Sequence, residues 1–278
     1  MSLYTVKMLG INITNSSKET ILKEIQKRLD SSGSNRAKSG QNQGKTMVIV
    51  TPNPEQVMRA RRDSHFAQLI NQADIAIPDG VGLVWAHQQL AKNSAEKLTK
   101  PIPGVECMEN LVFTAAEKRV PIVLIGGSGG LAVRALDCLR KKHPNLTGWA
   151  TDAPMMSING GQLVFPGKEE FLRRLSDRIL ATGAGFVFVG LGAPKQEYFI
   201  EQLQSILGKS KLQKTIILMS VGGSFDEISG RLPKPPEWVS AAGLKWLWRL
   251  ILEPWRIKRQ LALASFVFLV LRERFNLI

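Results

Sequence analysis

Short runs of consecutive apolar residues alternate with helical patterns along most of the chain. The apolar runs fall at residues 47–50, 73–77, 121–127, 186–192 and 215–223. Each run passes through glycine or proline into a segment whose apolar residues recur at helical spacing. Strands that are apolar throughout are typical of parallel sheets with both faces covered. The pattern therefore predicts an α/β fold, with a mostly parallel sheet and helices on both of its faces.

One further helix is predicted before the first of these strands. Within residues 16–30, Ile21, Ile25 and Leu29 recur at helical spacing. The next residues, 31–45, are rich in Ser, Gly and Asn and predict a mobile loop.

The character of the chain changes after about Arg231. From there to the end, nine basic residues stand against three acidic ones, and four of the six tryptophans lie in the same stretch. Trp and Arg interleaved with Leu are typical of helices at a membrane interface. We therefore divide the chain into a Rossmann-like α/β domain, residues 1–230, and a helical membrane-associating appendage, residues 231–278. The alternative for this appendage is a buried helical hairpin with a solvated basic face.

Composition and charge limit the cellular compartment and the kinds of binding partner that we expect for this protein. A formal net charge of +14 favours nucleic acid, phosphorylated substrates or an anionic lipid surface. The two cysteines show no CxxC spacing, and the first thirty residues resemble no secretory signal, which indicates the reducing cytoplasm. The apolar run from Leu261 to Leu271 is shorter than the roughly 20 residues of a spanning helix. We expect a cytoplasmic protein, peripheral on the inner face of the plasma membrane.

Four motifs follow the predicted strands. They are TPNPEQ (51–56), PDGVGL (78–83), IGGSGG (125–130) and GLGAPKQE (190–197). The carboxyl ends of parallel strands share one edge of a sheet, where α/β proteins bind their ligands. We therefore expect the four motifs to lie together.

Two of the motifs carry polar side chains suited to catalysis or binding. Asp79, after a strand and before two glycines, suits a general base at the mouth of a cleft, and the alternative is a helix cap. Gln196 stands at a helix start, where it could meet a ligand. Thr51 and Asn53 are either turn residues or polar groups that reach the same cleft.

The glycine-rich motif is a candidate phosphate loop. Gly126, Gly127, Ser128 and Gly129 lie between a strand and a helix, where backbone N–H groups can hold phosphate. The motif fits neither G-x-G-x-x-G nor the P-loop pattern, so a turn required only for packing is the alternative.

No metal or other cofactor is expected. The three histidines lack the spacing of metal ligands, and no Asp-x-Asp element is present in the sequence. A bound diphosphate would then need cations from the protein, and the C-terminal arginines could supply them.

Six ordered motifs resemble the WecB/TagA/CpsF glycosyltransferases over about residues 45 to 260. They are TPNPEQVMRARRD, ADIAIPDGVGLVWA, IGGSGG, FVFVGLGAPKQEYFI, SVGGSFDEISG and GLKWLWRLILEPWRIKR. The resemblance implies inverting, metal-independent transfer of an N-acetylhexosamine, typically N-acetylmannosamine or its uronic acid. The donor is a UDP-sugar, and the acceptor is a polyprenyl-diphosphate-linked N-acetylglucosamine in surface polysaccharide synthesis.

The resemblance also implies roles for individual residues. Asp79 resembles the general base, and Thr51, Asn53 and Gln196 resemble substrate-binding residues. Arg249, Arg256 and Arg259 match arginines that close over the UDP diphosphate when the enzyme settles on an anionic membrane. A homo-oligomer that buries the appendage is a further hypothesis.

Departures from the family pattern leave some points open. Residues 97–111 and 145–165 are atypical, which leaves the donor sugar undecided, and the tail after Gln260 extends beyond the usual end. Two rival classes are a nucleotide-dependent oxidoreductase and a basic nucleic-acid-binding module. We expect no nucleic acid among the partners, because the basic residues are interleaved with Trp and Leu.

Overall fold

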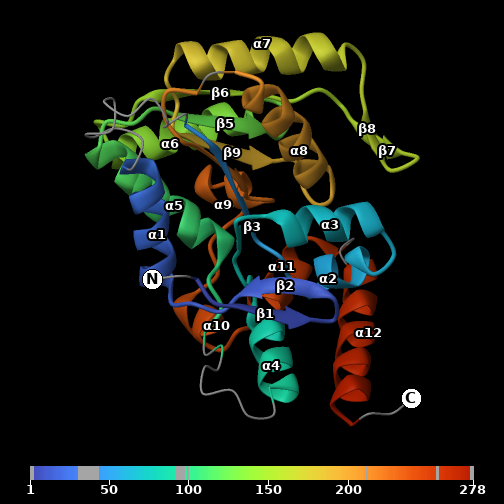
Figure 1. Cartoon of the computed structure of the whole chain (residues 1–278). Coiled ribbons are helices and arrows are strands. Elements are labelled where there is room, and N and C mark those ends of the chain that lie inside the picture. Colours follow the sequence, from blue (N-terminus) through green and yellow to red (C-terminus); the bar gives the residue numbers. More distant parts are fainter. Residues whose placement is uncertain are drawn as a thin grey trace.

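A parallel sheet forms the centre of the protein. The computed structural model describes residues 3–30, 44–91, 98, 100–210, 212–254 and 257–275 (Figure 1). In this part of the chain, six strands pair in the order β4-β3-β10-β9-β5-β6, and all neighbouring pairs are parallel. These strands are β3 (Thr46–Val50), β4 (Ile75–Ala76), β5 (Ile122–Gly126), β6 (Gly148–Thr151), β9 (Phe186–Gly190) and β10 (Ile216–Ser220). The predicted α/β fold with a parallel sheet is confirmed.

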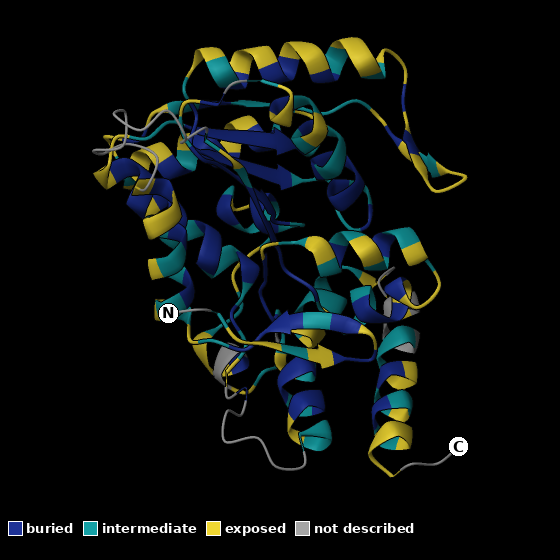
Figure 2. Ribbon diagram, viewed as in Figure 1, coloured by how far each residue is buried: buried dark blue, intermediate teal, exposed yellow. Residues whose placement is uncertain are grey.

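Alternate residues of each strand enter two separate apolar cores. In β3, Val48 and Val50 face the first core, whereas Met47 and Ile49 face the second. Burial on both faces explains why the strands are apolar throughout. Figure 2 shows the dark blue sheet between helices whose outer sides are yellow.

Helices cover both faces of the sheet. Those of the first core are α2 (Pro54–Ala60), α3 (Ser64–Gln72), α4 (Val81–Leu90), α7 (Lys168–Ala181) and α8 (Lys195–Gly208). Those of the second core are α1 (Lys18–Asp30), α5 (Gly104–Glu117), α6 (Leu131–Lys142) and α9 (Ser224–Ile228). The first core also holds residues of two antiparallel hairpins, β1 (Thr5–Met8) with β2 (Ile11–Thr14) and β7 (Ser157–Asn159) with β8 (Gln162–Val164).

The predicted N-terminal helix is confirmed as α1, which buries Ile21, Ile25 and Leu29. Of the predicted loop, residues 31–43 lie outside the described part of the chain. Strand β6 was not predicted, because it is a short edge strand in which only Trp149 is buried.

The strand order places a topological switch point at the carboxyl ends of β3 and β10. These neighbours are the first and last strands of the sheet along the chain, so the order differs from that of the usual Rossmann sheet. The loop after β3 leads to α2 in the first core, and the loop after β10 leads to α9 in the second. Because the two loops lead to opposite faces, α/β proteins of this kind bind ligands between them, and we name the region between these two loops the crevice.

Three helices follow residue 231. They are α10 (Glu237–Ala241), α11 (Lys245–Leu252) and α12 (Ile257–Arg274). Helix α12 packs against α2 and α4, and its Phe266 and Val270 are fully buried in the first core. One face of α12 therefore belongs to the core, although Phe268 on the same helix is 65% exposed. Within the described residues, we find no helix with the length and apolarity needed to cross a bilayer.

This packing predicts that α12 stabilises the α/β domain. Phe266→Ala should lower the free energy of unfolding by about 3–5 kcal/mol, because it leaves a cavity in a closed core. Phe268→Ala, on the exposed face, should change it by less than about 0.5 kcal/mol. Urea denaturation of both variants measures the difference, and equal small effects would show that α12 is only loosely attached.

Candidate active site

The segments that follow β3 and β4 contact each other and the end of β10 beside the crevice. The N–H of Asp79, after β4, donates to the carbonyl of Pro52, after β3, over 2.9 Å. The Thr51 hydroxyl donates to the carbonyl of Ser220, the last residue of β10, over 3.4 Å. The expectation that these motifs share one edge is confirmed.

Asp79 lies at the mouth of this crevice. It is half-buried and comes two residues before α4, whose N-cap position is held by Gly80 rather than by Asp79. Gly80 has φ of 93°, a left-handed conformation that favours glycine. The backbone thus presents the carboxyl group at the end of a buried strand, where a general base would be needed.

Thr51 and Asn53 have different surroundings. Thr51 is 5% exposed and packs against Gly104 at the start of α5, where an added Cβ would lie 3.2 Å from the Thr51 Cγ2 atom. The Asn53 side-chain oxygen accepts a hydrogen bond from the backbone N–H of Gln56 over 3.0 Å and so caps α2. The Asn53 side chain therefore has a structural role at the start of α2.

Gln196 connects the loops that follow β9 and β10. It is 1% exposed, and its Oε1 accepts a hydrogen bond from the Gly222 N–H over 3.0 Å. Its Nε2 donates to Glu197 Oε1 over 2.8 Å. Gln196 therefore holds the loop after β10 against the start of α8.

The glycine-rich loop already binds a carboxylate of the protein. Gly126, Gly127, Gly129 and Gly130 all have φ between 62° and 125°, and the Gly130 N–H donates to Asp152 Oδ2 over 2.9 Å. Ser128 in this loop is exposed. The carboxylate of Asp152 therefore stands beside this loop, where its charge would repel a phosphate bound at the start of α6.

The C-terminal helices reach both sides of the crevice. The Arg249 guanidinium, on α11, donates to the carbonyl of Gly223 after β10 over 3.2 Å. Gly243, between α10 and α11, lies so close to Val81 that an added Cβ would be 2.8 Å from the Val81 Cγ1 atom. Arg256 lies outside the described residues, and only the backbone of Arg259, in α12, is described.

The sequence model of the glycosyl transferase WecG/TagA/CpsF family matches residues 6–278. The chain belongs to this family of glycosyltransferases. The match extends to Ile278, so the tail after Gln260 lies within the length of the family, contrary to the expectation from the motifs.

Two curated relatives of this transferase carry the same name. The chain is 28% identical over 229 residues to the N-acetylglucosaminyldiphosphoundecaprenol N-acetyl-beta-D-mannosaminyltransferase of Bacillus subtilis (strain 168), covering 82% of this chain and 80% of that protein. It is 27% identical over 230 residues to the protein of that name from Bacillus spizizenii, covering 83% of this chain and 80% of the relative.

A separate hollow lies between α3 and α8, on the flank of the sheet of this transferase. Its lining includes Val48, Gln72, Glu197, Glu201 and Gln204. Its volume of about 50 Å³ holds a few waters at most, whereas nucleotide-sized ligands need several hundred Å³. The hollow is therefore too small to hold a nucleotide.

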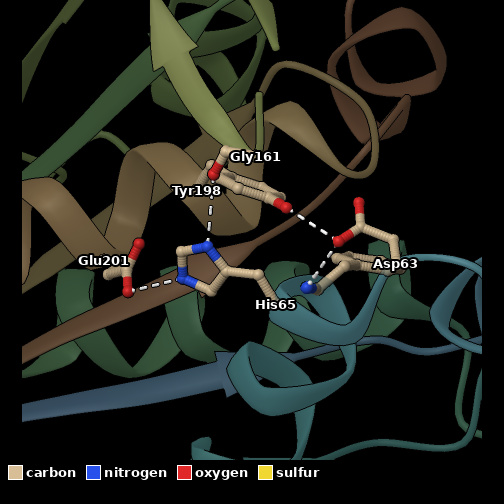
Figure 3. A network of polar contacts seen from close by, with 6 residues as sticks. Asp63, His65, Gly161, Tyr198 and Glu201 are labelled. Atoms are coloured by element: carbon tan, nitrogen blue, oxygen red, sulfur yellow. Dashed lines mark hydrogen bonds and ion pairs between the residues drawn. The ribbon is translucent and has the colours of Figure 1, made fainter. Parts of the chain in front are cut away.

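Next to this hollow, a polar cluster ties the β7–β8 hairpin to the helices (Figure 3). His65 on α3 places Nε2 2.9 Å from Glu201 Oε1 and Nδ1 3.3 Å from the carbonyl of Gly161 in the hairpin turn. Tyr198 donates to Asp63, which also caps α3. Since both imidazole nitrogens face acceptors, the protonated ring satisfies both, and the Glu201 hydrogen bond raises the pKa of His65.

The raised pKa predicts a pH-dependent contribution to stability. This contribution is fully present below the unfolded pKa of 6.5 and is lost as the pH rises through the higher folded pKa. Urea denaturation should show His65→Gln destabilised relative to wild type at pH 5.5 and much less so at pH 8.5. The difference should stay below about 1 kcal/mol, because both side chains are more than a third exposed. In a Glu201→Gln background it should vanish, and a pH-independent difference would contradict the ion pair.

Proposed function

We propose that this transferase moves an N-acetylhexosamine, N-acetylmannosamine or its uronic acid, from a UDP-sugar to a polyprenyl-diphosphate-linked N-acetylglucosamine. The single observation that carries the proposal is the arrangement at the carboxyl ends of β3 and β10, where Asp79 contacts the loop after β3 and Arg249 contacts the loop after β10. A base and a fork-shaped cation flanking one opening suit transfer from a diphosphate donor. The printed names of the two relatives support this sugar and this acceptor.

The mechanism follows from the chemistry of these two groups. Asp79 accepts the proton of an acceptor hydroxyl as its oxygen forms a bond to the anomeric carbon. The bond from that carbon to the diphosphate oxygen breaks, and UDP leaves with the electron pair. One displacement from the opposite face inverts the anomeric configuration. Arg249, joined by Arg256 and Arg259, neutralises the departing diphosphate without a metal ion.

The other residues of the crevice would bind the rest of the donor. We assign Thr51, Asn53 and Gln196 to binding the sugar and to holding the protein loops beside it. The glycine loop, Gly126, Gly127, Ser128 and Gly129, would contact the nucleoside rather than the diphosphate. Asp152 supports this assignment, since its carboxylate stands at the helix start where a phosphate would otherwise sit.

The C-terminal segment would place the active site at a membrane. We keep the division into residues 1–230 and an appendage, 231–278, that binds the anionic inner face of the plasma membrane. In α10 and α11, Trp238, Trp246 and Ile251 are between 42% and 68% exposed. Such side chains beside basic residues suit the headgroup region. A homo-oligomer that buries this surface in the absence of membrane remains part of the proposal, as does a role in surface polysaccharide synthesis.

Release of UDP from a panel of UDP-sugars tests the proposal. The protein is assayed in EDTA, with and without a synthetic polyprenyl-diphosphate N-acetylglucosamine, on vesicles with anionic lipid. Acceptor-dependent release from UDP-N-acetylmannosamine or its uronic acid supports the proposed reaction. No release from any UDP-sugar by folded, vesicle-bound protein would overturn it. Family membership already favours a transferase over an oxidoreductase or a nucleic-acid-binding module.

A further inference from the structure

A buried carboxyl group lies next to Gln196, at the start of α8. Glu197, in the first turn of α8, is 3% exposed and lines the hollow between α3 and α8. Its Oε1 accepts the hydrogen bond from Gln196 Nε2. Its Oε2 is enclosed and has no partner within hydrogen-bond geometry among the described residues, although the buried Ser220 side chain of β10 lies near. The mechanism above assigns Glu197 no role.

The hydrogen bonds of Gln196 leave its amide only one orientation. A backbone N–H can only donate, so the Gly222 N–H requires the oxygen of the Gln196 amide. This turns the amide nitrogen toward Glu197, which supplies the acceptor 2.8 Å away. The residue after Gly222 carries the carbonyl to which Arg249 donates. A continuous set of contacts thus runs from Glu197 through Gln196 to the turn that holds Arg249.

We propose that Glu197 is a positioning residue that fixes the Gln196 amide and, through it, the Gly222–Gly223 turn to which Arg249 binds. Part of this inference rests on the proposed function, because Gln196 and Arg249 are assigned to the donor there. The structural part, the hold of Glu197 on the turn, can be measured without any substrate.

The protonation state of Glu197 gives this role a pH dependence. Burial raises the pKa of Glu197 to about 7, against the opposing effects of Gln196, the Ser220 hydroxyl and the Arg59 charge on α2. Glu201, one turn further along α8, also lines the hollow, and it pairs with His65. The hydrogen bond from Gln196 lowers the pKa, which means that it is stronger to the carboxylate than to the neutral acid. Above neutral pH the hold of Glu197 on the Gln196 amide should therefore tighten.

The direct test is hydrogen exchange of the Gly222 amide in the full-length protein. In Glu197→Ala, Gln196 loses its acceptor, and the Gly222 amide should exchange about tenfold faster than in wild type, as expected for one lost hydrogen bond. Glu197→Gln keeps an oxygen acceptor and should retain the protection. Glu201→Gln, at the same hollow but bonded to His65, is the matched control and should leave the Gly222 amide unchanged.

The pattern among variants separates positioning from general stability. Gln196→Leu should release Gly222 to the same extent as Glu197→Ala, and combining the two should add nothing. In wild type the protection of the Gly222 amide, corrected for the intrinsic pH dependence of exchange, should rise as the pH rises from 6 to 8.5, and in Glu197→Gln it should not. Unchanged protection in Glu197→Ala would overturn the proposal. Equal loss of Gly222 protection in Glu197→Gln and Glu197→Ala would also overturn it.

Kinetics then tests the consequence for the reaction. Glu197→Ala should raise the KM for the UDP-sugar about tenfold, whereas Glu197→Gln, which keeps an oxygen acceptor, should have a KM near that of wild type. Wild-type kinetics in Glu197→Ala, with Gly222 released, would overturn the link to the donor. If the wild-type protein transferred no sugar, only the proposed function would be contradicted. The role of Glu197 would still be tested by hydrogen exchange, which needs no substrate.

Discussion

Asp79→Asn should lower kcat for acceptor-dependent UDP release about a hundredfold to ten-thousandfold. The substitution keeps the size and the backbone N–H that donates to Pro52, but it removes the oxygen that accepts the proton of the acceptor hydroxyl. Because the change affects the transition state more than the ground state, the affinity for UDP should stay close to that of wild type. Initial rates at saturating donor and acceptor, together with UDP titration calorimetry, measure the two effects.

A matched variant controls for the change of charge. Asp137→Asn removes a carboxylate from α6 whose side chain is 56% exposed, and it should leave kcat unchanged. If Asp79→Asn retained more than about a tenth of the wild-type kcat, with the donor bound normally, another group would be the base.

Arg249→Ala is expected to lower kcat/KM for the donor about a hundredfold to a thousandfold. Its guanidinium, held beside the crevice by the Gly223 carbonyl, would lose its contact with the diphosphate as negative charge develops on the leaving UDP. Arg249→Lys keeps the charge but not the fork, so it should recover only part of the loss. Steady-state kinetics with varied UDP-sugar measures all three proteins.

The loss at Arg249 must be separated from misplacement of α11. The Gly223 hydrogen bond alone contributes about 1 kcal/mol to stability, so urea denaturation should show a small change. Arg174→Ala removes an arginine from the exposed side of α7 and serves as the control. A fall in kcat/KM no greater than that of Arg174→Ala would show that Arg249 does not act on the donor.

Much of the fold and of the position of the site could be predicted from the sequence. The apolar runs predicted β3, β5, β9 and β10, because strands buried on both faces are apolar at nearly every position. Since all the strands are parallel, the motifs after them had to lie on one edge. Helix α7, by contrast, was missed although Leu172, Leu175 and Ile179 recur at helical spacing.

The roles of single side chains could not be predicted in the same way. Asn53 in TPNPEQ caps α2, and Gln196 uses its oxygen on the backbone of another loop. Asp152, 22 residues after Gly130, accepts a hydrogen bond from the Gly130 N–H at the start of α6, where the motif predicted a phosphate. The partners of Gln196 and Asp152 come from distant parts of the chain, which no local pattern specifies, whereas Asn53 caps a helix three residues away.

By itself, the sequence determined most strands of the sheet, the edge on which the motifs lie, and the family, since each follows from local periodicity or from ordered motifs. Only the tertiary structure decided which strands are neighbours, and therefore that the loops after β3 and β10 diverge to form the crevice. It also decided that Phe266 of α12 is a core residue and that Glu197 is enclosed behind Gln196. The physical reason is that burial and the resulting pKa depend on segments far apart in the chain, and these meet only when the two cores close.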